Sequence, residues 1–237
     1  MRWLALMFVV WGVQAQAVTC TDQTYGANSF TVCTVDPETE DLRLFRADAQ
    51  GVVLGSFAAI ETALGRPLAF AMNAGMYHPD REAVGLYIED GDQQAGLLTA
   101  ASAGNFGLLP NGVFCFGDGR ALVQETLAFR AAAPACRYAT QSGPMLVIDG
   151  VLHPRFLPDS PSRYVRNGVG TMAKGDQAVF VISNNPVNFY DFAVFMRDGL
   201  GLDNALYLDG KVSRLYAPGI GRNDRGFLLG PIVGVVE

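Results

Sequence analysis

The sequence predicts an α+β fold that is rich in β-structure, with a large, mostly antiparallel or mixed sheet system and a few covering helices. Three observations support this prediction: many short apolar runs, Asp-Gly pairs that follow or end several of them, and few segments with helical periodicity. Half of the 237 residues are hydrophobic and 17% are charged, so the chain can bury one sizeable core. We expect a single domain over residues 18–237.

The predicted strands are short runs bounded by Gly, Asn, Asp or Pro, residue types that favour turns. Asp-Gly pairs begin at residues 90, 118, 149 and 209, and such pairs favour the tight turns of antiparallel hairpins. The runs predicted as strands are residues 30–35, 42–47, 68–72, 84–88, 112–116, 145–148, 178–183, 205–208, 212–216 and 227–236.

Two segments, residues 57–64 and 189–200, are predicted as helices. Asn188 is suited to cap the second helix. One face of that helix is apolar at helical spacing, through Phe189, Phe192, Ala193, Met196 and Leu200. Residues 178–208 therefore have the pattern strand, helix, strand, and this is the one place where we expect a parallel pair of strands.

The first 17 residues have the pattern of a secretory signal peptide. Arg2 precedes an apolar run over residues 3–13, and small residues follow at Ala15 and Ala17. This run is shorter than the ~20 residues of a spanning helix, so an uncleaved anchor is the weaker alternative. A lipoprotein is weaker still, because Val18 and Thr19 precede Cys20. We expect a periplasmic or secreted protein with no stable membrane anchor after cleavage.

The chain is acidic, with a formal charge of −6, and loss of Arg2 would leave 16 basic against 23 acidic side chains. We therefore expect no nucleic-acid partner. In an oxidising compartment an even number of cysteines indicates disulfides, and three pairings are possible. The local pairing is favoured, because each pair flanks a hairpin-sized segment; a zinc site is the weaker alternative, since CxxC is absent and the chain has two histidines. The favoured pairs are Cys20 with Cys33 and Cys115 with Cys136.

Polar residues within apolar, Gly-rich surroundings gather at the ends of predicted strands, where a scaffold can hold a side chain in a cleft. The runs that contain them are FAMNAGMYHPD at residues 70–80, VGLYIEDG at 84–91, GNFGLLPNGVF at 104–114, QSGPMLVIDG at 141–150, RNGVG at 166–170, VFVISN at 179–184 and LYLDG at 206–210. In this order they resemble the phosphodiester glycosidase family, which includes the enzyme that removes N-acetylglucosamine from its phosphodiester on mannose 6-phosphate. Within the family the chain is similar to a short exported bacterial branch.

The resemblance implies a hydrolase that cleaves the glycosidic bond of a sugar-1-phosphodiester, releases the sugar and leaves a phosphomonoester. Asp209 matches the aspartate of the family's Asp-Gly motif and is the expected catalytic carboxylate. Arg166 matches the family's arginine and is expected to bind phosphate, with Arg163 assisting. His78 is the expected acid if the leaving group needs one. No cofactor is expected, although a divalent cation stays an alternative.

Four further residues are suited to substrate contact, and one departs from the family. Asn73 and Asn105 can hold sugar hydroxyls or a phosphate oxygen, and Gly75 and Gly143 permit close backbone approach. Many relatives continue the Asp-Gly motif with further glycines, whereas here Lys211 follows. Lys211 either supplies a cationic contact to phosphate or indicates that the motif is only a hairpin turn.

Each of these residues also has an ordinary structural role, so alternatives stay open. Asp209 can cap a turn, Arg166 can form an ion pair, and Asn73 can occupy a left-handed turn. Other functions also stay open: a non-catalytic envelope module that binds phosphorylated glycan, or a metal-dependent phosphodiesterase that uses Asp80 with Asp209. A serine hydrolase is weaker, because the chain has no G-x-S-x-G.

Overall fold

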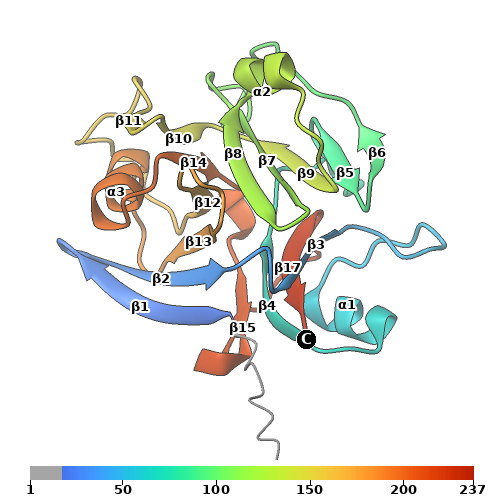
Figure 1. The fold of residues 1–237 in the computed structure, drawn as a ribbon. Helices are drawn as coiled ribbons and strands as arrows, with labels where there is room; N and C mark the ends of the chain where they lie inside the picture. Colours follow the sequence, from blue (N-terminus) through green and yellow to red (C-terminus); the bar gives the residue numbers. More distant parts are fainter. Residues whose placement is uncertain (1–17) are drawn as a thin grey trace, which may run out of the picture.

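The structure is a computed structural model that describes residues 18–237. It confirms the β-rich fold: three sheets surround a common centre, and three short α-helices pack on their outer faces (Figure 1). The signal peptide predicted at residues 1–17 lies outside the described residues. No helix among the described residues is long and apolar enough to cross a membrane.

The first sheet has seven strands, and one of its faces is covered by α3 (Phe189–Val194) and the π-helical turn Phe195–Gly199 that continues it. Asn188 caps α3, as predicted, because its side chain accepts a hydrogen bond of 2.8 Å from the backbone N–H of Asp191. In spatial order the strands are β1 (Thr19–Tyr25), β2 (Asn28–Val35), β13 (Ala178–Ser183), β12 (Asn167–Thr171), β14 (Asn204–Tyr207), β10 (Met145–Ile148) and β11 (Val151–Leu152).

The second sheet has five strands and packs against α1 (Phe57–Leu64). Ser56 caps α1, and Gly65 ends it in the left-handed region at φ 63°. Phe57 and Ile60 bury the apolar side of α1 against the sheet. In spatial order the strands are β16 (Arg222–Asn223), β15 (Leu215–Ala217), β4 (Leu68–Asn73), β17 (Ile232–Val236) and β3 (Asp41–Phe45).

The third sheet also has five strands, and α2 (Thr126–Ala132) packs Phe129 against it. Its strands in spatial order are β6 (Asp92–Ala95), β5 (Tyr87–Glu89), β9 (Tyr138–Ser142), β7 (Gly112–Gly117) and β8 (Arg120–Glu125). Two short 3-10 helices, Gly210–Val212 and Pro218–Ile220, flank β15.

The three sheets share one core, in which each contributes a buried phenylalanine. Phe180 of β13 lies with its ring centroid 4.9 Å from that of Phe70 of β4 and 5.7 Å from that of Phe114 of β7. Aromatic pairs at this separation add to the free energy of burying their area. This cluster therefore fixes the sheets against one another and determines which strand ends meet.

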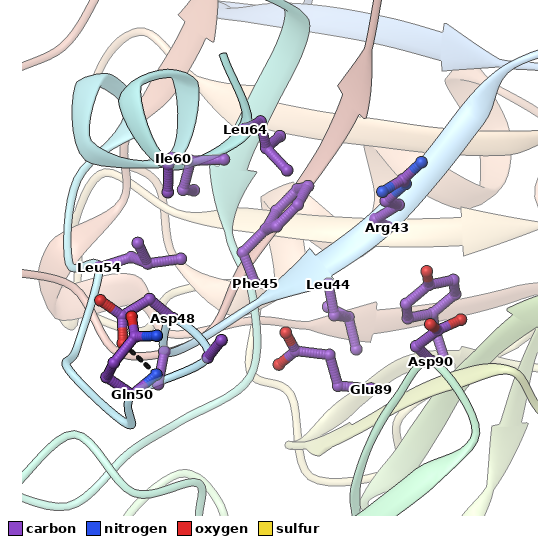
Figure 2. Close-up of a pocket in the computed structure, with 14 residues that line it drawn as sticks. Arg43, Leu44, Phe45, Asp48, Gln50, Leu54, Ile60, Leu64, Glu89 and Asp90 are labelled. Atoms are coloured by element: carbon purple, nitrogen blue, oxygen red, sulfur yellow. Dashed lines mark hydrogen bonds between the residues drawn. The ribbon is translucent and has the colours of Figure 1, made fainter. Parts of the chain in front are cut away.

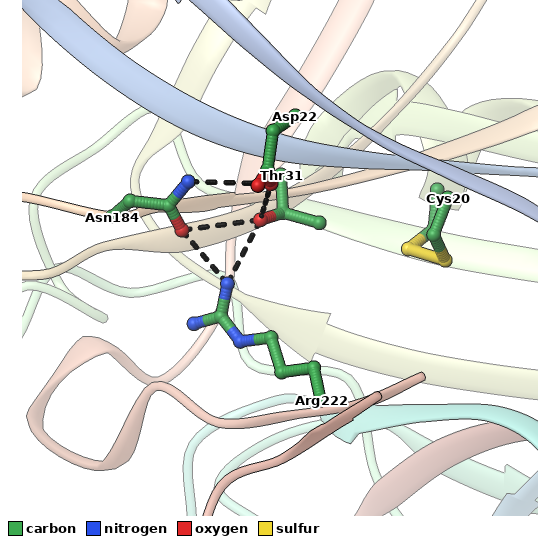
Figure 3. Close-up of a disulfide and its surroundings, with 6 residues drawn as sticks. Cys20, Asp22, Thr31, Asn184 and Arg222 are labelled. Carbon is green, nitrogen blue, oxygen red and sulfur yellow. Dashed lines mark hydrogen bonds between the residues drawn. A yellow bond between two sulfur atoms is a disulfide. The ribbon is translucent and has the colours of Figure 1, made fainter. Parts of the chain in front are cut away.

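Two disulfides close the pairs that the sequence favours, Cys20–Cys33 across β1 and β2 and Cys115–Cys136 in the third sheet. Near the first, Arg222 of β16 donates from Nη1 to Thr31 Oγ1 and Asn184 Oδ1, each at 2.8 Å (Figure 3). This arginine links the second sheet to the first.

The structure corrects several predicted elements. Residues 178–183 and 57–64 have their predicted bounds, but the expected parallel pair is wrong, because β12 lies between β13 and β14 and is antiparallel to both. The sequence of β12, Asn-Gly-Val-Gly-Thr, has a single large apolar residue and does not resemble a strand.

The Asp-Gly pairs at residues 90, 118 and 149 form hairpins, but the hairpin expected at residue 209 is wrong, because a 3-10 helix follows and β14 and β15 belong to different sheets. Strands β5, β15 and β17 begin later than predicted. The remaining strands and α-helices that were not predicted are β1, β6, β8, β9, β11, β16 and α2.

The disulfide of the β1–β2 hairpin gives a stability prediction. Replacing Cys20 and Cys33 by Ala should lower the free energy of unfolding by roughly 3 kcal/mol, since the bridge closes a loop with a sequence separation of 13. Urea denaturation of the variant and the wild type measures the difference. Equal denaturation midpoints would show that the bridge does not constrain the unfolded chain.

Candidate active site

Two buried asparagines join the first and second sheets. Asn73 ends β4 and Asn167 begins β12, and Asn167 Nδ2 donates to the Oδ1 and backbone O of Asn73, both at 3.1 Å. Asn73 Nδ2 donates in turn to the backbone O of Asp209 at 2.7 Å, and Asn73 Oδ1 accepts from the backbone N–H of Arg214 at 2.9 Å. A buried amide whose donors and acceptors are all engaged fixes its neighbours firmly. The Asn73–Asn167 pair therefore fixes the backbone on both sides of the Asp-Gly turn.

Asp209 is the half-buried carboxylate that these contacts position. The backbone N–H of Leu208 donates to Asn167 O at 3.1 Å, and that of Asp209 donates to Ala74 O at 3.2 Å. The next residue must be glycine, because a Cβ at Gly210 would overlap the hydroxyl of Tyr207. The chain thus leaves β14 along a single path, which places Asp209 at the ends of β4, β12 and β14.

The charge of Asp209 acts on two tyrosines, Tyr207 and Tyr77. Burial raises the pKa of Tyr207 to about 12, with the Asp209 charge adding to the increase and Arg166 opposing it. Burial also raises the pKa of Tyr77, and the Asp209 charge is the next cause. Both phenols therefore stay protonated at neutral pH. The Tyr207 hydroxyl accepts from Arg166 Nη1 at 3.3 Å, and the Tyr77 hydroxyl donates to Leu228 O at 3.4 Å.

Arg166 lies behind Tyr207 and is only 1% exposed. Its guanidinium donates to Val187 O and Ser162 O, each at 2.9 Å, and to Tyr207 Oη at 3.3 Å, and it lies 3.7 Å from the ring centroid of Phe189. Among the described residues it takes part in no ion pair, and burial lowers its pKa. Arg166 thus reaches the site through Tyr207, and its expected direct contact with phosphate stays a prediction.

Ser213 and Arg214 complete the site from the start of β15. The Ser213 hydroxyl lies 3.1 Å from Val165 O and 3.2 Å from Asn167 Oδ1, and so ties the Asp-Gly turn to β12. Arg214 donates from Nη1 to Phe227 O, and its positive charge opposes the increase in the pKa of Tyr77. The charge of Asp209 thus acts on both tyrosines, while the charge of Arg214 acts on Tyr77 and that of Arg166 acts on Tyr207.

The other residues predicted to contact substrate lie in several different environments. A Cβ at Gly75 would lie 2.6 Å from Gln141 O, and one at Gly143 would lie 2.8 Å from Phe106 O, so both glycines permit close packing of strand ends. Asn105 and His78 are exposed in loops, and Arg163 pairs with Asp191 at 3.0 Å. The backbone of Lys211 belongs to the 3-10 helix Gly210–Val212. The substrate contacts expected of these residues stay predictions.

Five residues of this group had no individual role predicted for them: Asn167, Tyr207, Tyr77, Ser213 and Arg214. Three of them lie in the runs that carry the family resemblance: Asn167 follows Arg166, Tyr77 precedes His78, and Tyr207 precedes Leu-Asp-Gly. Their chemistry depends on the meeting of the strand ends, which no local pattern indicates.

Several cavities lie outside this group. One, of about 450 Å³, lies between α1 and β3, with apolar walls from Phe45 and Ile60 and carboxylates from Glu89 and Asp90 (Figure 2). Another, of about 420 Å³, has Arg214 in its wall and so adjoins the site. Among the described residues no group of three or more His, Cys, Asp or Glu side chains is placed to hold a metal ion.

This arrangement places one half-buried carboxylate close to protonated phenols and guanidinium groups, which are suited to donate hydrogen bonds to an anion. The profile of the phosphodiester glycosidase family matches residues 67–225, and the chain belongs to this family.

Two similar proteins extend this result. The chain is 35% identical over 212 residues to the uncharacterized protein YigE of Escherichia coli (strain K12), covering 89% of this chain and 82% of that protein. Its fold is similar to the catalytic domain of zebrafish N-acetylglucosamine-1-phosphodiester alpha-N-acetylglucosaminidase, auto-inhibited by its pro-peptide, with a TM-score of 0.64 and 16% identity. That match covers 93% of this chain and 82% of the zebrafish chain.

The raised pKa of Tyr207 gives a prediction for stability at alkaline pH. Its folded-state pKa of about 12 exceeds the ordinary value of 10.0, so its contribution is fully present below pH 10 and is lost as the pH rises to 12. At pH 11 the loss should be about 1 kcal/mol. Urea unfolding at pH 8 and pH 11 should show a smaller drop for Tyr207→Phe than for the wild type.

The matched control is Tyr25→Phe, which alters an exposed tyrosine and should behave like the wild type. An equal drop for Tyr207→Phe and the wild type would contradict the assignment of the shift to Tyr207.

Proposed function

We propose that the protein is an exported hydrolase that cleaves the glycosidic bond of a sugar-1-phosphodiester, releasing the sugar and leaving a phosphomonoester. The observation that supports this most strongly is the placement of Asp209, the aspartate of the family's Asp-Gly turn, by the buried Asn73–Asn167 pair. Two disulfides support export to an oxidising compartment, either the periplasm or the medium.

The proposed reaction breaks the bond between the anomeric carbon and the phosphate oxygen. Asp209 stabilises the positive charge that develops at the anomeric carbon, or activates the water that attacks it. The oxygen of water bonds to the anomeric carbon, the electron pair of the broken bond goes to the phosphate oxygen, and a proton of water is released. The leaving phosphomonoester is a weak base, so a strong general acid is not required.

The protonated tyrosines act on the phosphate in this proposal. Tyr77 and Tyr207 donate hydrogen bonds to its oxygens, and Arg166 strengthens the Tyr207 donor through the hydrogen bond at 3.3 Å. Arg214, which is half-buried, supplies a positive charge near Tyr77. The roles of Arg163, Asn105, His78 and Lys211 in binding or proton transfer stay open.

Replacing Asp209 by Asn should reduce turnover at least ~100-fold, the range of a lost charge-stabilising group at a reacting centre. The assay uses a panel of α-linked sugar-1-phosphate methyl diesters in ¹⁸O-labelled water, with and without chelator. Cleavage at the anomeric carbon places ¹⁸O in the sugar and leaves methyl phosphate. Asp92→Asn is the matched control, because Asp92 is exposed at the start of β6.

Other outcomes separate the alternatives. Incorporation of ¹⁸O into the phosphate, with turnover abolished by chelator, would indicate a metal-dependent phosphodiesterase. Binding of the diesters without turnover would indicate a non-catalytic module. Full turnover by Asp209→Asn would remove this carboxylate from the mechanism.

A further inference from the structure

A cavity of about 420 Å³ adjoins the candidate site on the side of Arg214. It lies between the start of α1, strand β15 and the segment that follows β16. Its polar walls come from Ser56, Glu61, Arg214, Tyr216, Asn223, Asp224 and Arg225. The charged and polar side chains of this lining are suited to contact a charged ligand.

The carboxylates of this cavity already have partners. Asp224 accepts hydrogen bonds from Arg222 Nε and Nη2 at 3.0 to 3.2 Å and from the backbone N–H of Leu215 at 3.0 Å. Glu61 Oε1 accepts from Tyr216 Oη and from the backbone N–H of Leu68, both at 3.0 Å. Asp224 is therefore neutralised by Arg222, whereas Glu61 is held by two neutral donors and keeps its negative charge at the edge of α1.

The arginines of the cavity are in the opposite situation. Within the described part of the chain, neither Arg214 nor Arg225 belongs to an ion pair. Burial lowers the pKa of Arg214, although Tyr77 and Asp224 favour its charged form. A partly desolvated guanidinium that has no carboxylate partner is stabilised when a bound anion takes the place of that partner. Because Asp224 is paired with Arg222, which lies outside the lining, Arg214 and Arg225 face Glu61 as the one carboxylate of the described lining without an ion pair.

Arg214 is held in a fixed position, which a binding site requires. Its backbone N–H is bound by Asn73 Oδ1 at 2.9 Å, and its guanidinium donates to Phe227 O. The segment after β16 lies directly on the guanidinium, because a Cβ at Gly226 would overlap it. Since Asn73 also binds the backbone O of Asp209 at 2.7 Å, one side chain sets both the carboxylate and the wall of the cavity.

We propose that this cavity is a subsite for a second anionic group, such as a phosphate or a carboxylate, carried by the alcohol side of the substrate. The inference rests on the proposed function and narrows it: the preferred substrates are diesters whose alcohol part is itself anionic, as in a chain of repeating phosphodiesters. Arg214 and Arg225 bind the second anion while Asp209 acts at the anomeric carbon.

The test compares two sugar-1-phosphate diesters that share one sugar. In the first the alcohol part is methanol, and in the second it is glycerol 3-phosphate, which keeps its own phosphate as the second anion. The wild type should have a kcat/KM at least ~10-fold higher for the second substrate, as expected of a charged hydrogen bond. Arg225→Gln should abolish this preference and leave turnover of the methyl diester unchanged. Arg130→Gln, an exposed change on α2, is the control and should behave like the wild type. Equal preference in Arg225→Gln and the wild type would overturn the proposal.

A binding measurement separates failure of this inference from failure of the proposed function. Glycerol 3-phosphate is titrated into the full protein while the side-chain N–H signals of its arginines are followed by NMR. Shifts of both Arg214 and Arg225 in the wild type, with the Arg214 shift lost in Arg225→Gln, support the subsite even when no diester is hydrolysed. If those signals do not respond, or respond equally to glycerol, the cavity is not an anion site.

Discussion

The reciprocal contact between Asn73 and Asn167 is the interaction on which the candidate site depends. It lies where β4 of the second sheet meets β12 of the first, and both amides are buried. Through it, the backbone of Asp209 and that of Arg214 are fixed by the same side chain. An unpaired amide at this depth would destabilise the fold, so the contact forms only when the two sheets are correctly docked. The docking of the two sheets and the position of the candidate carboxylate therefore depend on the same pair of amides.

The positions of the three sheets depend both on the apolar core and on the contact between Asn73 and Asn167. Phe70, Phe114 and Phe180 set the relative positions of the three sheets, and the strand ends then meet at the asparagines. In β12, a Cβ at Gly168 would lie 2.8 Å from Leu206 O, so the glycine allows β14 to lie close and present Asp209. Arg166 tolerates burial because carbonyl groups and the Phe189 ring replace water around its charge.

Local patterns predicted much of the fold, and the resemblance to the family predicted part of the candidate site. Asn188 was identifiable because an N-cap is a local feature of sequence. Asp209 was selected through the resemblance to the family's motif, since the local Asp-Gly signal predicts a hairpin that does not form there. Strand β12 was not predicted, since neighbours that are distant in the chain, β13 and β14, stabilise a Gly-rich segment with weak strand propensity. Tyr207 and Arg214 were missed for a related reason: their chemistry comes from burial and from contacts between sheets.

The central claim is that Asn73 and Asn167 act as one unit. A double-mutant cycle tests it directly, with the free energy of unfolding measured for Asn73→Ala, Asn167→Ala and the double variant. The account predicts strong non-additivity, with a coupling energy of about 1–3 kcal/mol, because the first substitution already leaves the second amide without its partner. Free energies that add to within about 0.5 kcal/mol would contradict it.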